Sequence, residues 1–204
     1  MTIPPGGGAA AGLVLAAGAG TRFGARPKQL AVLGGRSLLQ WALDAQTAVE
    51  PGVLDPIVVV LGSHAEEIRR EIDLGRAQAV VCSDWAAGQS ASLRAGLRAL
   101  GEAERVVVTL GDAPFLSSDL IARFALEAGP LPLRAVYDGR PGHPVVLGRE
   151  QITMLRGGGQ NRDQGARGLL GGARTIEAGH LCSGRDVDTP EDLEEVRDEA
   201  RAVI

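Results

Sequence analysis

A glycine-rich loop followed by two cationic side chains is the first feature of the sequence that could do chemistry. Gly18 and Gly20 come directly after an apolar run, residues 12–17, and Arg22 and Lys28 follow shortly after. Glycines at the end of a buried strand let backbone N–H groups face a polyphosphate, and cations neutralise its charge. The spacing fits neither a Rossmann fingerprint nor a P-loop. It predicts a phosphate-binding loop, with a simple tight turn as the alternative.

Carboxylates at the ends of expected strands could hold a cation. Asp112 directly follows Gly111 and the apolar run 105–110. Mg²⁺ is usually held by one or two carboxylates together with substrate phosphates. Asp186 and Asp188 lie two residues apart, so in extended backbone they point the same way. The alternatives are that Asp112 forms a turn and that Asp188 assists the cap of the last helix, although Thr189 already fills that role.

These residues need a scaffold that brings strand ends together. Short apolar runs alternate with amphipathic stretches, and a β-branched run such as 56–61 indicates a buried parallel strand. The expected strands are residues 12–17, 56–61, 77–82, 105–110 and 173–177; the expected helices are 37–49, 65–72, 90–100, 117–128 and 189–202; residues 134–137 and 144–147 flank an Asp138-Gly139 turn as a hairpin-like excursion. The alternation predicts an α/β fold with a single doubly wound, mostly parallel sheet.

Composition narrows the class of protein. The chain has 204 residues and a net charge of −4, which fits one globular domain and gives no basic face for nucleic acid or a membrane. We expect residues 1–11 to be a flexible leader, residues 12–204 to be the domain, and the Gly-rich segment 157–172 to be a loop around a short helix. Cys82 and Cys182 show no metal-type spacing, so we expect reduced thiols in a cytoplasmic protein.

Four motifs in order resemble one enzyme family. They are Leu15-Ala-Ala-Gly18 with Arg22 and Lys28, then Gly111-Asp-Ala-Pro114, Pro141-Gly-His-Pro144 and Asp186-Val-Asp-Thr-Pro-Glu-Asp192. Together they are similar to the molybdenum-cofactor nucleotidyltransferases, which belong to a wider group with the CMP-Kdo synthetases and the sugar-phosphate nucleotidyltransferases. The resemblance runs from residue 12 to about residue 201 and implies a Rossmann-like nucleotidyltransferase fold.

The resemblance also implies roles for individual residues. Asp112 and Asp188 would ligate Mg²⁺, and Arg22 and Lys28 would hold the triphosphate, so that Arg22, Lys28 and Asp112 are the catalytic residues. Ser90 lies in a segment similar to the one beside the nucleotide in the family, or it simply caps a helix. His143 would contact the acceptor, with a structural role as the alternative. The expected nucleotide-binding residues are Leu15, Ala16, Ala17, Gly18, Gly20, Arg22, Lys28 and Ser90.

The expected reaction follows from the same resemblance. Within the family, Leu-Ala-Ala-Gly is typical of cytidylyl members and Leu-Ala-Gly-Gly of guanylyl members, so Ala17 favours CTP. Ala113 stands where Met or Gln is common. The implied enzyme transfers CMP from CTP to a phosphorylated acceptor such as molybdopterin and releases pyrophosphate. Its implied protein partner is a client molybdoenzyme or the chaperone of one.

Three rival functions are weighed against this expectation. The first is guanylyl transfer to molybdopterin or to another phosphorylated small molecule. The second is a nucleotide-binding regulatory protein without turnover, which would not need both Asp112 and Asp188. The third is an NAD-dependent oxidoreductase, which the glycine spacing and the missing acid after a second strand disfavour.

Overall fold

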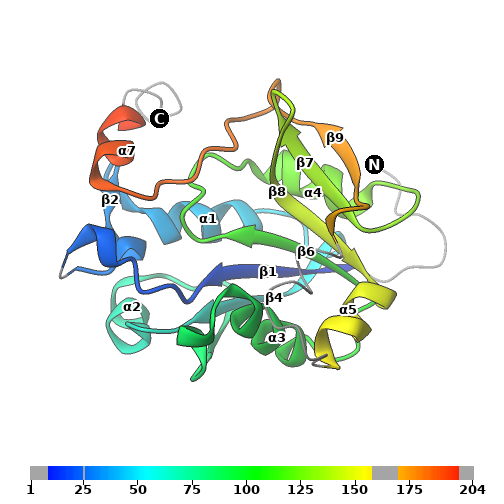
Figure 1. The fold of residues 1–204 in the computed structure, drawn as a ribbon, viewed down its shortest axis with the longest axis horizontal. Coiled ribbons are helices and arrows are strands. Elements are labelled where there is room, and N and C mark those ends of the chain that lie inside the picture. The colour runs from blue at the N-terminus through cyan, green and yellow to red at the C-terminus, as the bar shows by residue number, and fades with distance from the viewer. Residues whose placement is uncertain (1–8, 25, 158–169, 198–204) are drawn as a thin grey trace.

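A seven-stranded sheet forms the centre of the computed structural model, which describes residues 9–24, 26–157 and 170–197. The strand order is β5-β4-β1-β6-β8-β7-β9 (Figure 1). All neighbouring strands in this sheet are parallel except where β8 meets β6 and β7. The strands are β1 (Ala10–Ala16), β4 (Leu54–Leu61), β5 (Gln78–Val81), β6 (Arg105–Leu110), β7 (Leu133–Tyr137), β8 (Arg140–Gly148) and β9 (Arg174–Glu177). The mostly parallel, doubly wound sheet is therefore confirmed.

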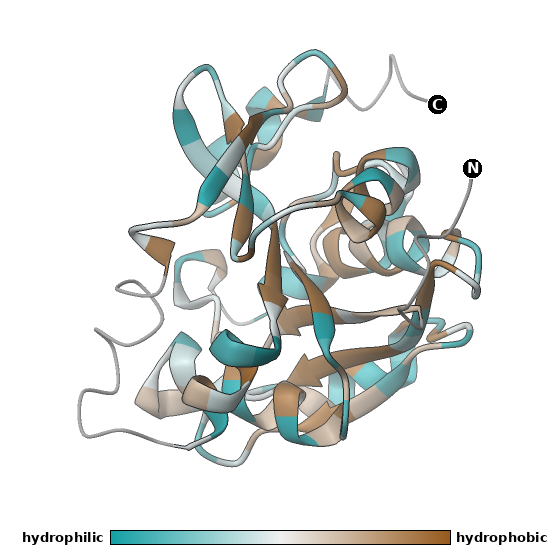
Figure 2. Ribbon diagram, turned by 90° about the vertical axis from the view of Figure 1, so that its right-hand side faces the viewer, coloured by the Kyte–Doolittle hydropathy of each residue, from teal (hydrophilic) through white to brown (hydrophobic). Residues whose placement is uncertain are grey.

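The sheet is buried because helices cover both of its faces. Every residue of β1 is buried, as expected for a central strand of a parallel sheet. One face packs against α1 (Leu38–Thr47), α2 (Ala65–Glu71) and α4 (Ser118–Leu126), and the other packs against α3 (Gln89–Ala99) and α5 (Arg149–Arg156). Figure 2 shows the hydrophobic strands enclosed between these layers. Among the described residues, no helix is long and apolar enough to cross a membrane.

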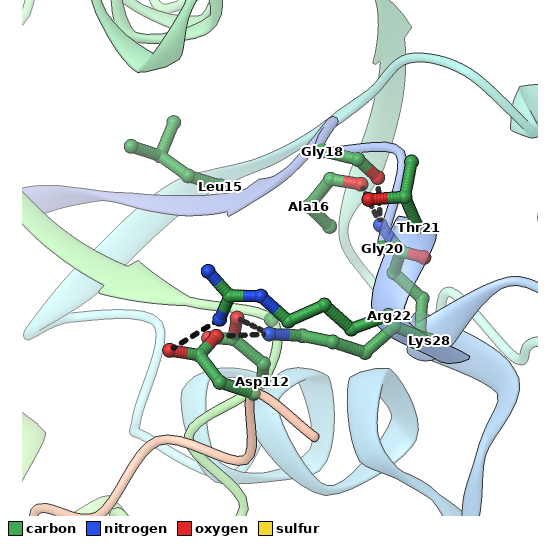
Figure 3. A pocket seen from close by; sticks show the side chains of 11 residues that line it. Leu15, Ala16, Gly18, Gly20, Thr21, Arg22, Lys28 and Asp112 are labelled. Carbon is green, nitrogen blue, oxygen red and sulfur yellow. Dashed lines mark hydrogen bonds and ion pairs between the residues drawn. The ribbon is translucent and has the colours of Figure 1, made fainter. Parts of the chain in front are cut away.

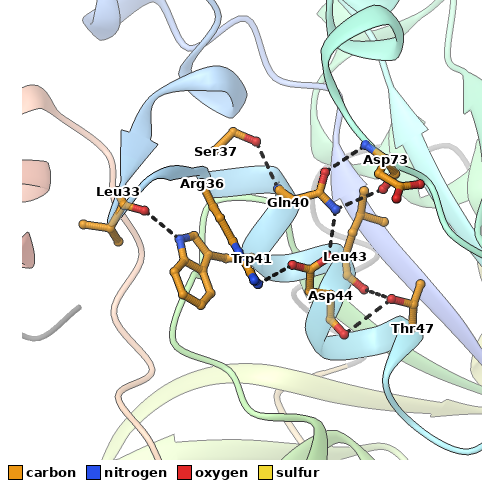
Figure 4. Close-up of polar contacts among 9 residues, drawn as sticks. All are labelled: Leu33, Arg36, Ser37, Gln40, Trp41, Leu43, Asp44, Thr47 and Asp73. Carbon is orange, nitrogen blue, oxygen red and sulfur yellow. Dashed lines mark hydrogen bonds and ion pairs between the residues drawn. The ribbon is translucent and has the colours of Figure 1, made fainter. Parts of the chain in front are cut away.

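Polar contacts around α1 fix the segment that precedes it (Figure 4). Ser37 caps the helix by accepting from the backbone N–H of Gln40 at 3.2 Å, as expected for an N-cap serine. The Trp41 indole donates to the carbonyl of Leu33 at 2.9 Å, and Arg36 lies over the Trp41 ring. These bonds hold the small hairpin of β2 (Val32–Leu33) and β3 (Arg36–Ser37), which follows directly after the segment that carries Lys28.

Most expected elements lie where the sequence predicts them, with two main differences. β1 begins at Ala10, so residues 10–11 belong to the sheet and not to a leader. Helix α5 was not expected, because its segment is short and mostly polar, although two of its apolar residues, Ile152 and Leu155, are buried on one side of the helix. The last helix, α7 (Pro190–Glu195), begins as predicted, with Thr189 at the N-cap and Pro190 next to it. Most of the Gly-rich segment 157–172, residues 1–8 and residues 198–204 lie outside the described residues.

Candidate active site

The carboxyl ends of β1 and β6 meet at one edge of the sheet and form the floor of a cavity of about 310 Å³ (Figure 3). The backbone N–H of Gly111 donates to the carbonyl of Leu15 at 2.9 Å, which continues the pairing of the two strands to their last residues. Ligands bind at such edges in doubly wound sheets. The cavity is lined by Leu15, Ala16, Gly18, Gly20, Thr21, Arg22, Lys28, Gln29, Gly111, Asp112 and Asp188.

Lys28 lies between two carboxylates in this cavity. Its ammonium nitrogen is 2.6 Å from Oδ2 of Asp112 and 2.7 Å from Oδ1 of Asp188. Burial alone would lower the pKa of Lys28, but the two carboxylates outweigh burial and raise the pKa above its ordinary value. Arg22 adds a second positive charge, since its Nη1 lies 3.9 Å from Oδ2 of Asp188. The site therefore combines two cations and two acids, brought together from three distant segments of the chain.

Asp186 is a third acid close to this pair. Desolvation, and then the negative charges of Asp112 and Asp188, raise the pKa of Asp186 to about 7. Asp188 lines the cavity, whereas Asp186 is not among its lining residues.

The glycine loop is held in a fixed conformation from two sides. Gly20 has φ of +59°, which favours glycine, and a Cβ built on it would lie 2.5 Å from the Cβ of Lys28. The stem of Lys28 therefore packs directly under the loop. The buried Gln29 side chain uses both hydrogens of its amide on this loop, donating to the carbonyl of Ala16 at 2.9 Å and to that of Gly18 at 2.7 Å. Only an amide or a charged nitrogen could satisfy both carbonyls at once.

The strap, residues 181–188, carries Asp188 to the cavity, and it crosses above the loop that follows β6 in Figure 1. The backbone N–H of Val187 donates to the carbonyl of Asp112 at 2.9 Å, which joins the two acidic segments directly. At the other end of the strap, the ring of Tyr137 packs against Gly184, where a Cβ would approach the ring atoms to 2.2–2.5 Å. Tyr137 also donates to the carbonyl of His143 at 2.5 Å, so the hairpin of β7 and β8 anchors the strap.

This packing gives a prediction for a residue that does not line the cavity. Gly184→Ala should push the strap away from Tyr137, misplace Asp188 and lower kcat/KM by roughly tenfold to a hundredfold, as misplacement by about 1 Å does elsewhere. Steady-state kinetics together with the melting temperature measure this effect. The control is Gly172→Ala, because a Cβ there meets nothing within 4 Å. Wild-type kinetics in Gly184→Ala would show that the strap does not position Asp188.

The structure brings most of the expected site residues together. The lining of the cavity includes Leu15, Ala16, Gly18, Gly20, Arg22, Lys28, Asp112 and Asp188 from the sequence prediction. The structure shows what both acids contact. The Asp112 carboxylate contacts Lys28 from a turn after β6. The backbone N–H of Asp188 donates to Asp192 at the start of α7, while its carboxylate contacts Lys28.

Three expected residues do not line the cavity. Ala17 is buried beside Gly62. Ser90 is buried inside α3, and Gly88 occupies the N-cap, so the interpretation of Ser90 as a plain N-cap is wrong. His143 lies half-buried in β8, where desolvation, helped by the charge of Arg134, lowers its pKa to about 4. His143 is therefore neutral at physiological pH.

Three residues in the lining were missed: Thr21, Gln29 and Gly111. Thr21 adjoins Gly20, and Gly111 is the first residue of the motif that carries Asp112, so the sequence held a signal for both positions. Gln29 follows Lys28 directly, but nothing in the sequence shows that its amide reaches back to two carbonyls of the loop.

A mostly parallel sheet with this edge site is the architecture of the α/β nucleotidyltransferases. The chain belongs to the family described as the MobA-like NTP transferase domain, whose sequence pattern matches residues 12–178. Asp112 and Lys28 lie inside the matched segment. Asp188 lies beyond the matched segment, and the structure places it in the cavity through its contact with Lys28.

Individual relatives carry different names. The chain is 32% identical to nicotine blue oxidoreductase of Paenarthrobacter nicotinovorans, over 89% of this chain and 93% of that protein. It is 38% identical to the bifunctional protein GlmU of Pseudarthrobacter chlorophenolicus, over 74% of this chain but only 32% of that longer protein. Among solved structures, Rv0371c of Mycobacterium tuberculosis superposes with a TM-score of 0.78 at 27% identity, covering 93% of this chain and 98% of that one. A second structure of Rv0371c is a complex with manganese.

Proposed function

We propose that this protein is a Mg²⁺-dependent nucleotidyltransferase that transfers CMP from CTP to a phosphorylated acceptor. The observation that carries the proposal is the position of Lys28 between Asp112 and Asp188, directly under a glycine loop at the carboxyl edge of the sheet. A loop with free N–H groups, two cations and two acids is what a metal-bound triphosphate requires. The matched family, described as NTP transferase, supports the same reaction class.

The acids fit a divalent cation by their chemistry. Mg²⁺ takes oxygen ligands from one or two carboxylates and keeps water and substrate phosphates as its other ligands. The described residues contain no group of three or more His, Cys, Asp or Glu that could hold a metal, so Asp112 and Asp188 would share the ion with the nucleotide. The manganese complex of Rv0371c supports a divalent metal in a related protein. When bound, the metal would neutralise charge on the triphosphate.

The protein residues act by position and charge. Gly18 and Gly20 leave room for the phosphates to approach the backbone, and Arg22 and Lys28 offset the negative charge that develops on them. An oxygen of the acceptor phosphate attacks the α-phosphorus, a new P–O bond forms, and the bond to the β-phosphate oxygen breaks to release pyrophosphate. A phosphate acceptor is already ionised at neutral pH, so the step needs no general base.

The acceptor and the protein partner belong to the same proposal. We infer a phosphorylated small molecule such as molybdopterin, with His143 on the β7–β8 hairpin as a contact to it, and a client molybdoenzyme or its chaperone as the recipient of the product. The support for His143 is its place on the hairpin that anchors the strap, through the bond between its carbonyl and Tyr137.

The nucleotide preference gives the next prediction. We expect CTP to be used at least about tenfold better than GTP, because the Leu15-Ala-Ala-Gly18 motif resembles that of cytidylyl members, and small differences in pocket shape are worth roughly 1–3 kcal/mol of discrimination. Ala17 is buried against Gly62, so its methyl group would act by setting the position of the loop and not by touching the base. Ala17→Gly should then narrow the preference without inverting it. A competition assay with CTP and GTP at equal concentrations measures both, and a clear GTP preference in the wild type contradicts the cytidylyl assignment in favour of guanylyl transfer.

A second candidate function has one observation in its favour. A relative of nearly the same length as this chain is named an oxidoreductase, although the glycine spacing here is not that of a Rossmann dinucleotide site. The two candidates differ in their products. Incubation with NADH or NADPH and a quinoid acceptor tests for oxidation of the nicotinamide at 340 nm, and incubation with NTPs tests for pyrophosphate. Nicotinamide oxidation without pyrophosphate release would favour the oxidoreductase.

A further inference from the structure

The two acids of the site already have a cation that belongs to the protein. The Lys28 ammonium contacts one oxygen of each carboxylate, and its side chain is only 11% exposed. It therefore holds Asp112 and Asp188 together without help from a metal. A divalent ion and this ammonium would both need the oxygens that lie between the two acids.

Asp112 has one oxygen in contact with Lys28 and the other enclosed by the protein. Its Oδ2 contacts Lys28, whereas its Oδ1 is buried and has no hydrogen-bond partner among the described residues. Mg²⁺ and similar ions bind carboxylate oxygen at about 2.0–2.1 Å. An ion bound to Oδ2 of Asp112 at that distance would lie next to the ammonium, and like charges so close repel strongly at a partly buried site. The Asp188 carboxylate is more open to an incoming ion, because its side chain is 57% exposed.

The ammonium can leave only toward another anion. The stem of Lys28 is fixed under Gly20, so only the end of the side chain can turn. Asp112 and Asp188 are the only carboxylates among the described residues that line the cavity. Within the cavity, a displaced ammonium therefore finds no other carboxylate, and a triphosphate held by the glycine loop provides the negative charge.

We propose that Lys28 and the divalent metal are alternative partners of Asp112, so that metal binds tightly only together with the nucleotide. This inference rests on the proposed nucleotidyl transfer. It assigns Lys28 two successive positions: before substrate binds, it keeps the two acids at the geometry that the metal needs, and afterwards it contacts the triphosphate. Metal and nucleotide then bind with positive coupling, which by linkage works in both directions.

The experiment measures binding of Mn²⁺ alone to the full chain, from the loss of the electron paramagnetic resonance signal of free Mn²⁺. Lys28→Met should bind Mn²⁺ at least about tenfold more tightly than the wild type, within the range of typical coupling between sites. Lys28→Arg keeps the cation and should stay close to the wild type. Arg26→Met is the matched control, because it removes one exposed positive charge that pairs with Glu71 outside the site. The double variant Lys28→Met/Asp112→Asn should lose the increase in Mn²⁺ affinity that Lys28→Met alone shows.

A second measurement uses the wild type and does not depend on the folding of a variant. After subtraction of the Mn²⁺ that a non-hydrolysable CTP analogue binds in solution, the analogue should tighten Mn²⁺ binding to the wild type about tenfold or more, and should tighten it less in Lys28→Met. Equal Mn²⁺ affinity of the wild type with and without the analogue overturns the inference, as does a Lys28→Met protein that binds Mn²⁺ no more tightly than Arg26→Met. If the wild type releases pyrophosphate but Mn²⁺ binding does not change as expected, the exchange of Lys28 and metal is wrong and the proposed function stands. If Mn²⁺ binding changes as expected but no NTP supports nucleotidyl transfer, the proposed function is wrong.

Discussion

Asp112→Asn should lower kcat for nucleotidyl transfer by about a thousandfold, the upper end of what one lost electrostatic contact costs an enzyme. The substitution keeps the volume of the side chain and removes its charge, so a cation at the end of β6 loses its principal ligand. The substitution removes an ion pair with Lys28 and changes no residue of the apolar core. We therefore expect the fold to persist. Initial rates at saturating CTP and Mg²⁺, together with the melting temperature, measure the two effects.

The matched control for this substitution is Asp119→Asn. Asp119 is an exposed acid in the first turn of α4, on the element that follows Asp112 in the chain. It should leave kcat within about twofold of the wild type, as surface substitutions away from a site usually do. If Asp112→Asn kept near-normal turnover at saturating metal, Asp112 would not be a metal ligand.

Gly20→Ala should lower kcat/KM by roughly a hundredfold, the scale expected when catalytic groups are misplaced by about 1 Å. Two effects combine at this position. A residue with a Cβ costs about 1–2 kcal/mol in left-handed backbone, and the new methyl group would lie 2.5 Å from the Cβ of Lys28. The loop and Lys28 must therefore separate, which moves the ammonium relative to Asp112. Kinetics with varied CTP should show the loss mainly as a raised KM for the nucleotide.

Gly24→Ala separates the two effects. Gly24 also has positive φ, at +77°, but a Cβ there meets nothing within 4 Å. Its ψ of −136° lies outside the left-handed helical region that Gly20 occupies, so this variant carries at least as much backbone strain, and it should still lose much less activity. Equal losses in Gly20→Ala and Gly24→Ala would show that the strain of the loop decides activity, and that the close approach to Lys28 does not.

Much of the fold could be predicted because its signals are local. Continuous apolar runs mark β1, β4 and β6, and Asp112 stands out as an acid directly after such a run. The start of helix α5 could not be predicted from the sequence. It is capped by the side chain of Gln151, which accepts a hydrogen bond from the backbone N–H of Gly148. A glycine before a polar segment does not by itself indicate the start of a helix.

The parts of the site that could not be predicted depend on contacts between distant segments. Gln29 fixes the loop through carbonyls more than ten residues earlier, and the strap is held by Tyr137 against Gly184. The sequence motifs indicate which residues carry charge. They do not show that the Lys28 ammonium lies between Asp112 and Asp188, because that arrangement requires the strap to cross the carboxyl edge of the sheet.

The most direct test of the central claim is pyrophosphate release from each of the four NTPs with Mg²⁺ and a panel of phosphorylated acceptors that includes molybdopterin. We expect release that requires both Mg²⁺ and an acceptor, is fastest with CTP, and is lost in Asp112→Asn. Pyrophosphate release that is unchanged in Asp112→Asn, or none from any NTP while the protein oxidises NADH or NADPH with a quinoid acceptor, would contradict the central claim.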